Sequence, residues 1–102
     1  MEIKVSQMGS RTRFEVLGDI DERGAEILKS HFKQLSITAV KELVIDLAQV
    51  GHIGSSGIGK LLLFYKNLGI NGGTISIVNA SEPIFQLLTE LKLNAIFSIS
   101  KK

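Results

Sequence analysis

The sequence predicts an α/β domain with a mixed four- to five-stranded sheet, a parallel core and helices packed on it, in the order β-β-α-β-α-β-α-(β). Three observations lead to this prediction. Residues 2–18 alternate like a hairpin, apolar strand runs then alternate with helical stripes, and 102 residues leave room for one core. We therefore expect a single domain, 1–102, whose parallel strands are joined by right-handed crossovers.

A hairpin and a helix are expected first. Glu2–Val5 and Arg13–Leu17 alternate polar and apolar residues on either side of a turn at Met8-Gly9-Ser10. Asp21 comes just before a helical stripe, so its carboxylate is predicted to cap that helix. The inward positions of this first helix recur at intervals of three, four and three: Ala25, Leu28, Phe32 and Leu35.

The middle of the chain predicts a buried strand and a second helix. Glu42–Leu47 is predicted to be a strand, and it contains a continuous apolar run, as expected for a strand covered on both faces. The helix begins near Ser55 and ends at Gly69. Its predicted buried stripe is Ile58, Leu61, Leu62, Tyr65 and Leu68. Leu63 and Phe64 widen this stripe, which suggests that part of the helix faces a partner.

A strand, a helix and a short last element complete the chain. Thr74–Val78 follows a glycine turn, and Asn79 or Ser81 caps the third helix, with Pro83 in its first turn. The predicted apolar face of this helix is Ile84, Leu87, Leu88 and Leu91. Residues 95–99 form either a short last strand or part of a terminal segment.

Composition argues against several classes of protein. The net charge is +2, and the 12 basic and 10 acidic residues are interspersed, so no dense basic stripe predicts nucleic-acid binding. The chain has no cysteine, which excludes disulfides and thiolate zinc sites and fits a reducing compartment. It lacks a visible signal peptide and an apolar run of about 18 residues. We expect a cytoplasmic protein without membrane insertion.

A Gly-Ser-Ser-Gly turn, Gly54 to Gly57, opens the second helix and is the strongest functional signal. Ser55 and Ser56 stand where the first N–H groups of a helix are unpaired and its dipole is positive. A phosphate added there could accept hydrogen bonds from these unpaired N–H groups. Of the two, Ser55 is the better candidate for a simple cap.

The sequence predicts no catalytic residue, cofactor or metal. His31 and His52 lack an acidic ligand cluster. The glycines around residue 57 do not have the spacing of a phosphate-binding loop. A Ser-His-Asp triad could be composed from Ser55, His52 and Asp46 by residue type alone, but the sequence lacks the G-x-S-x-G motif that would accompany it. Asp46 is instead expected to bond loop N–H groups.

Four stretches together resemble a STAS domain, the fold of bacterial anti-sigma-factor antagonists. Gly18–Asp21 resembles the G-x-[LI]-D segment, Val44–Leu47 the central strand and Glu90–Ile99 the closing segment. The most specific is Ile53–Gly59, which is similar to the signature [IM]-D-S-[ST]-G-[LI]-G. The four stretches span nearly the whole chain.

The resemblance implies a regulatory switch rather than an enzyme. Ser56 matches the residue that a partner serine kinase, itself the anti-sigma factor, phosphorylates in this family. The unphosphorylated antagonist binds the kinase and frees the sigma factor; a phosphatase resets the switch. The kinase would supply ATP and magnesium, so this chain needs no cofactor. The implied partner-binding residues are Asp21, Ser55, Ser56, Gly57, Ile58 and Gly59.

One departure from the signature keeps an alternative open. Gly54 stands where the family usually has aspartate, so the carboxylate beside the acceptor must come from Asp21 or Asp46, if from anywhere. Stand-alone STAS-like domains also serve as accessory subunits of lipid ABC transporters, which is the alternative function. GTP or ATP binding by the same surface is a third possibility. Gly57 and Gly59 serve either backbone freedom or close partner approach.

Overall fold

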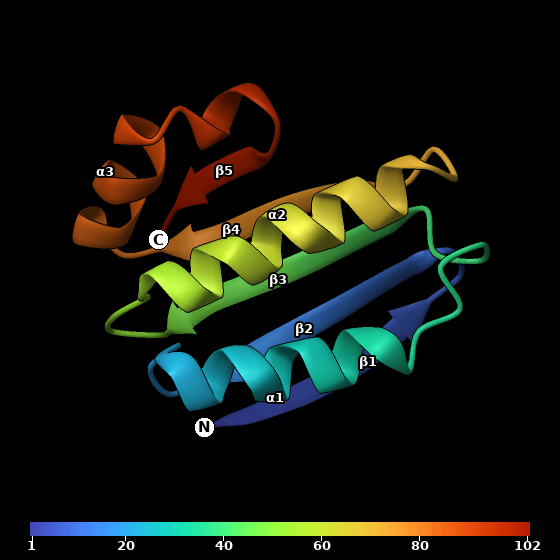
Figure 1. Cartoon of the computed structure of the whole chain (residues 1–102), viewed down its shortest axis with the longest axis horizontal. Coiled ribbons are helices and arrows are strands. Elements are labelled where there is room, and N and C mark those ends of the chain that lie inside the picture. Colours follow the sequence, from blue (N-terminus) through green and yellow to red (C-terminus); the bar gives the residue numbers. More distant parts are fainter.

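Five strands and three α-helices follow one another in the predicted order (Figure 1), and the computed structural model describes residues 1–102 throughout. The elements are β1 (Glu2–Met8), β2 (Arg11–Leu17), α1 (Glu22–Lys33), β3 (Glu42–Gln49), α2 (Ser55–Gly69), β4 (Thr74–Ala80), α3 (Glu82–Glu90), the 3₁₀ turn η1 (Leu93–Ala95) and β5 (Ser98–Lys101). The predicted fold class is confirmed, with five strands.

The strands lie in the sheet in the order in which they occur in the chain, β1-β2-β3-β4-β5. β1 pairs with β2 antiparallel, and every later pair is parallel. Each crossover therefore places the next strand beside the previous one, always toward the same edge of the sheet. Because such crossovers are right-handed, they place their helices on one face of the sheet. Figure 1 shows α1 and α2 side by side over this face, with α3 beside β5 at the edge.

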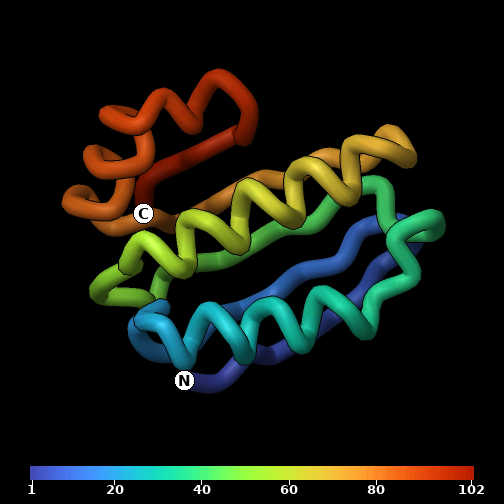
Figure 2. Tube along the Cα trace, viewed as in Figure 1, coloured from blue at the N-terminus to red at the C-terminus, as the bar shows by residue number.

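Both chain ends lie where α1 and α2 begin (Figure 2), which is the end of the sheet where β2, β3 and β4 finish. The Lys102 N–H donates to Ala80 O at 2.9 Å, and this bond fastens the C-terminus to β4. The carboxyl ends of parallel strands, where loops carry ligand and partner sites in open α/β sheets, thus gather at one end of the molecule. No helix combines the length and the apolar character that crossing a membrane requires.

The core is one cluster of 23 buried apolar residues between the sheet and the helices. Leu43, Ile45 and Leu47 of β3 all face into it, because alternate residues of a strand share a face. The predicted stripes of α1 and α3 are confirmed at their centres. Leu91, however, is 48% exposed, because α3 ends at Glu90 and Leu91 lies beyond its last turn.

The predicted buried stripe of α2 was partly wrong. Leu61 and Leu68 are buried as expected, but Leu62 and Tyr65 are 40% and 39% exposed. Phe64, predicted only to widen the stripe, is fully buried and stacks on Phe32 of α1, with ring centroids 4.1 Å apart. The apolar residues of α2 nearly encircle it, so their spacing did not fix which side faces the sheet.

The remaining differences concern boundaries. The hairpin turn is shorter than predicted, because Met8 still belongs to β1 and only Gly9 and Ser10 turn the chain. β3 and β4 each run two residues further than expected. The last strand begins at Ser98 rather than at residue 95, and η1 precedes it. Ser81, one of the two predicted caps, accepts the Ile84 N–H and begins α3.

The burial of α2 can be tested with two truncations. Phe64→Ala should lower the free energy of unfolding by about 3–5 kcal/mol, because it leaves a cavity and removes the stack on Phe32. Leu62→Ala, on the exposed side of the same helix, should change it by less than about 1 kcal/mol. Urea unfolding followed by circular dichroism measures both. Equal losses would contradict the orientation of α2.

Candidate functional site

Two loops at the carboxyl end of the sheet are joined by main-chain hydrogen bonds. Gly18 leaves β2 with φ +110°, a conformation that favours glycine, and its N–H donates to Gln49 O at 3.1 Å. The Ile20 N–H donates to His52 O, and the Gly54 N–H donates to Ile20 O, both at 2.9 Å. This short parallel bridge brings the two predicted motif segments, 18–21 and 53–59, together.

The N-terminus of α2 has no side-chain cap. Gly54 is the N-cap residue, with extended backbone, and the Ile58 N–H donates to its carbonyl at 3.1 Å. Ser55 is thus the first helical residue, and the expectation that it caps the helix is wrong. By contrast, Asp21 caps α1 and Ser81 caps α3 through their side chains.

Ser55 and Ser56 are both exposed, in the first turn of α2. The first N–H groups of a helix have no partner within it, and no side chain accepts from them here. They therefore point toward the region where the two hydroxyls meet solvent, and the positive end of the helix dipole lies there as well. This arrangement can hold an anion attached to either serine.

The two glycines after the serines have different roles. A Cβ on Gly57 would lie 2.6 Å from Ile20 Cγ2 and 2.9 Å from Ile53 Cγ1, so only glycine lets α2 pack on the two bridged isoleucines. Gly59 faces open space, with no atom within 4 Å of an added Cβ. Gly57 is thus required by packing, whereas the main chain at Gly59 is accessible from outside.

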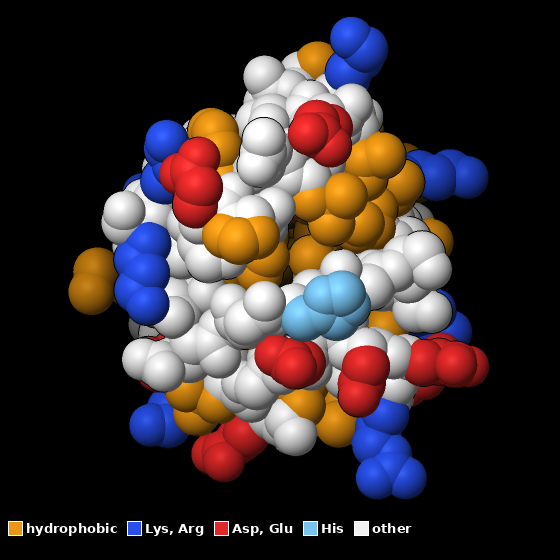
Figure 3. Space-filling model, turned by 90° about the vertical axis from the view of Figure 1, so that its left-hand side faces the viewer, with side chains coloured by type: hydrophobic (Ala, Val, Ile, Leu, Met, Phe, Trp, Pro, Cys, Tyr) orange, Lys and Arg blue, Asp and Glu red, His pale blue; other side chains and the backbone are white.

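The end of the molecule where α1 and α2 begin exposes both apolar and acidic side chains. Figure 3 views this end of the molecule and shows apolar side chains gathered on one side of a histidine and acidic side chains on the other. The exposed carboxylates in the loop before α1 and its first turn are Asp19, Asp21 and Glu22. Asp19 Oδ1 accepts the Gly51 N–H at 3.3 Å. Ile58, next to Gly57, is partly exposed and packs against the core.

Position 54, where the family signature usually has aspartate, is bordered by few groups. An added Cβ there would lie 3.8 Å from Ile20 O and 4.0 Å from His52 Nε2, both ordinary contacts. His52 is exposed and is the nearest titratable side chain to that position. From the sequence alone, His52 was considered only as a metal ligand or a member of a catalytic triad.

Neither of the two carboxylates considered as substitutes serves Ser55 or Ser56. Asp21 Oδ1 accepts the Gly24 N–H at 2.7 Å, which confirms its predicted role as the cap of α1. Asp46 lies between Ile45 and Leu47, which face the core, so its side chain points to the opposite face of the sheet. The carboxylate missing at position 54 is therefore not replaced by a hydrogen bond from elsewhere.

Asp46 is the centre of a polar network on the helix-free face. Its carboxylate accepts Arg13 Nη2 at 2.6 Å, the Ala48 N–H at 2.9 Å and Asn79 Nδ2 at 3.1 Å. Asp46 thus accepts a main-chain N–H as predicted, but Ala48 belongs to β3 and not to a loop. Arg13 and Asn79 were missed, although Arg13 alternates with the buried Phe14 and so had to face this side. Asn79 adopts φ +59°, a conformation that asparagine tolerates.

The pKa of Asp46 is lowered from its ordinary 3.8. Burial of the carboxylate raises the pKa, but the bonds from Ala48, Asn79 and Arg13, together with the charge of Arg13, outweigh burial. The network thus favours the ionised form. It is structural, because it lies on the face of the sheet opposite to α2.

With the fold and this loop pair described, the family can be stated. The chain belongs to the STAS domain family, whose model matches residues 3–102. The resemblance noted in the sequence is thereby confirmed.

Named relatives come from several bacteria. The anti-sigma-B factor antagonist of Bacillus subtilis is 26% identical over all 102 residues, which cover 93% of that protein. A STAS-domain containing protein of Pseudomonas aeruginosa is 25% identical over 90% of each chain. The crystal structure of an anti-sigma factor antagonist from Mycobacterium paratuberculosis superposes on this structure with a TM-score of 0.85. The two sequences are 25% identical, and the match covers 99% of this chain and 86% of that chain.

The phosphorylated form of the Bacillus cell fate determinant SpoIIAA shares the fold. Its TM-score is 0.77 at 15% identity, with 99% of this chain and 93% of that one covered. These likenesses identify an anti-sigma-factor-antagonist-like STAS domain.

The packing role of Gly57 predicts opposite effects for two similar substitutions. Gly57→Ala should lower the free energy of unfolding by about 1–3 kcal/mol, because the new methyl group overlaps Ile20 and Ile53. Gly59→Ala, in open space on the same helix, should raise it by about 0.5–1 kcal/mol. Thermal unfolding distinguishes the two. A Gly57→Ala protein as stable as Gly59→Ala would contradict the close contact.

The Asp46 network predicts a pH-dependent stability. Because the pKa in the folded protein lies below 3.8, the carboxylate stabilises the fold above that pH, and this contribution disappears as pH falls through the lowered pKa. Asp46→Asn should therefore lower the free energy of unfolding by about 1–3 kcal/mol at neutral pH. The difference from wild type should shrink in acid.

Urea unfolding at a series of pH values measures this difference. Glu42→Gln is the matched control, since Glu42 also pairs with an arginine and a hydroxyl but is more exposed, 29% against 9% for the Asp46 side chain. It should lose less than about 1 kcal/mol. A pH-independent difference for Asp46→Asn would show that charge is not what this residue contributes.

Proposed function

We propose that this protein is a partner-switching antagonist of an anti-sigma factor, and that Ser56 is its phosphoacceptor. The partner is a serine kinase that is also the anti-sigma factor, and a cognate phosphatase removes the phosphate. The observation that carries the proposal is the position of Ser56 in a STAS signature, exposed in the uncapped first turn of α2. Asp21, Ser55, Ile58 and Gly59 belong to the proposed contact surface, whereas Gly57, also expected there, is buried and supports this surface from below.

A phosphate on Ser56 would be tolerated by the fold. It carries about −1.5 to −2 charges at neutral pH, and the free N–H groups and dipole of α2 favour an anion at this place. The side chain is exposed and no hydrogen bond has to be broken to accept it. We therefore expect the phosphorylated and unphosphorylated forms to share one backbone.

The effect of the phosphate would fall on docking instead. The same end of the molecule exposes apolar side chains and carboxylates (Figure 3), and a partner that docks on it would cover the exposed Ser56. A doubly charged group at that point would have to lose its water when the partner docks. The phosphorylated form is thus released.

A second function, as a permanent accessory subunit of a lipid ABC transporter, is favoured by one observation. α2 exposes three large apolar side chains, Leu62, Leu63 and Tyr65, each between 38% and 40%. A permanent contact would cover these side chains, and the replacement of aspartate by Gly54 would then have no effect on function. In this role the state of Ser56 would not affect assembly.

The two functions can be separated by identifying the phosphorylated residue and the partner together. In protein recovered from its native cells, phosphopeptide mass spectrometry should place phosphate on Ser56. Ser56→Ala should abolish this signal, whereas Ser55→Ala, the matched control one residue away, should retain it. Phosphorylation that persists undiminished in Ser56→Ala would exclude Ser56 as the acceptor.

Pull-downs from native lysate then test the switch. Wild type should recover a serine-kinase ATPase, and Ser56→Asp should recover at least about tenfold less, because a buried unpaired charge costs more than about 1.4 kcal/mol. Ser55→Asp controls for the addition of charge nearby. Equal recovery of transporter subunits by wild type and Ser56→Asp would refute the switch and support the assembly role.

A further inference from the structure

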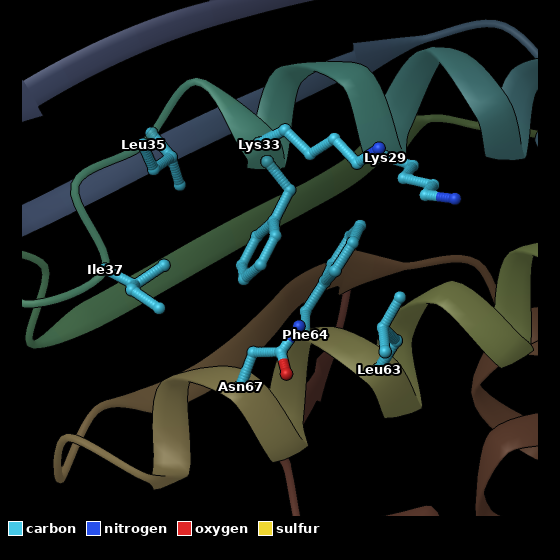
Figure 4. A pocket seen from close by; sticks show the side chains of 8 residues that line it. Lys29, Lys33, Leu35, Ile37, Leu63, Phe64 and Asn67 are labelled. Atoms are coloured by element: carbon cyan, nitrogen blue, oxygen red, sulfur yellow. The ribbon is translucent and has the colours of Figure 1, made fainter.

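A groove lies between α1 and α2, away from the serines. Figure 4 shows it from close by, with Phe64 of α2 extending between the helices, and Phe32 of α1 stacks on Phe64. Their stacked rings form its floor, and both are almost completely buried. Leu35 and Ile37, from the segment after α1, and Leu63 of α2 complete an apolar lining. The accessible apolar surface of the groove thus comes mainly from Leu35, Ile37 and Leu63, because the two rings below them are buried.

Two lysines border this apolar groove and no carboxylate lines it. Lys29 is half-buried and Lys33 exposed, and neither forms an ion pair or a hydrogen bond. Figure 4 shows both extending along the α1 side. The amide of Asn67 adds a polar group on the α2 side. Cationic groups beside an apolar cavity complement a molecule with an apolar body and an anionic head.

The same two lysines also line a second, polar hollow of 140 Å³ together with Ser30 and Glu26. Glu26 is the one carboxylate there, and it pairs with Lys60 of α2 at 3.6 Å. Lys29 and Lys33 therefore lie between an apolar space and a polar one. An anionic head placed at the lysines would have its apolar body directed into the groove and its other face in water.

The volume of the groove sets the size of the occupant. It measures about 240 Å³, whereas an apolar cavity of about 150 Å³ holds a benzene molecule. Pockets for drug-sized ligands start at about 300 Å³. The groove therefore fits a short apolar chain or a single ring, and is too small for the whole apolar face of a partner helix.

We propose that this groove is a binding site for a small anionic amphiphile, a carboxylate that carries an apolar chain of about eight carbons. The chain lies between Leu35 and Ile37 on one side and Leu63 on the other, above the two stacked rings, and the carboxylate meets Lys29 and Lys33. The site is formed by the later turns of both helices, whereas Ser56 is in the first turn of α2. The proposal is therefore independent of the phosphorylation of Ser56.

Titration of the ¹⁵N-labelled protein with octanoate, below the concentration at which it forms micelles, tests the site. Saturable amide shifts should be confined to residues 29–37 and 63–67. Octylammonium, with the same chain and the opposite charge, should bind at least about fivefold more weakly, because the lysines then repel the head. Equal affinity for both ions would overturn the proposal, since it would show that charge selects nothing.

Variants distinguish the floor from the rim. Lys29→Gln with Lys33→Gln should weaken octanoate binding about three- to tenfold, and Lys66→Gln, which removes a charge from α2 outside the groove, should leave it unchanged. Leu63→Asp should abolish binding without unfolding the protein, because Leu63 is 38% exposed. Unchanged binding in both the double lysine variant and Leu63→Asp would overturn the site.

Other occupants would give different results. Shifts that spread over all exposed apolar residues without saturating would mean adsorption and refute the site. If octanoate has no effect but a higher protein concentration alone shifts the groove amides, a second copy of the chain occupies the groove. If octanoate has no effect and only an acidic protein partner shifts these amides, the groove is a protein contact. Both outcomes would overturn the ligand proposal.

Discussion

The parallel bridge between Ile20 and Ile53 is the constraint on which the functional end of this molecule depends. Both side chains are buried, and both meet the first turn of α2 at Gly57. The bridge therefore fixes two things at once: the distance between the loops that start α1 and α2, and the height of α2 above the sheet. Were either isoleucine displaced, the cap at Asp21 and the serines would separate, since each lies one to three residues from a bridged isoleucine.

This rigid support explains how a modification could act without refolding. The groups that fix the loops are main-chain atoms and buried apolar side chains, whereas the serines are exposed and make no contact on which the fold relies. The free N–H groups at this point come from helix geometry, so they cost nothing extra to provide. The atoms that stabilise the two loops are therefore not the atoms that a modification would change.

Much of the fold followed from the sequence because strand and helix periods alternate clearly along the chain. Asp21 and Ser81 could be recognised as caps since capping is a local interaction. The expected cap at Ser55 was a local prediction that failed, but the other failures were nonlocal. The side of α2 that faces the sheet depends on Phe32 of another helix. Likewise, Arg13 and Asn79 lie 33 residues on either side of Asp46, and no local pattern joins three strands.

Gly54 illustrates why a departure from a signature needs a structure to interpret it. Sterically it is neutral, because a side chain there would meet only ordinary contacts. Its consequence is electrostatic. A carboxylate at position 54 would lie beside a phosphorylated Ser56 and repel it, whereas glycine leaves the positive end of α2 unopposed, with His52 as the nearest titratable group. In the proposed switch, glycine at position 54 removes a carboxylate that could orient the Ser56 hydroxyl. It also removes a negative charge that would destabilise the phosphorylated form. The balance is shifted toward release of the partner, and toward greater dependence on the phosphatase to reverse it.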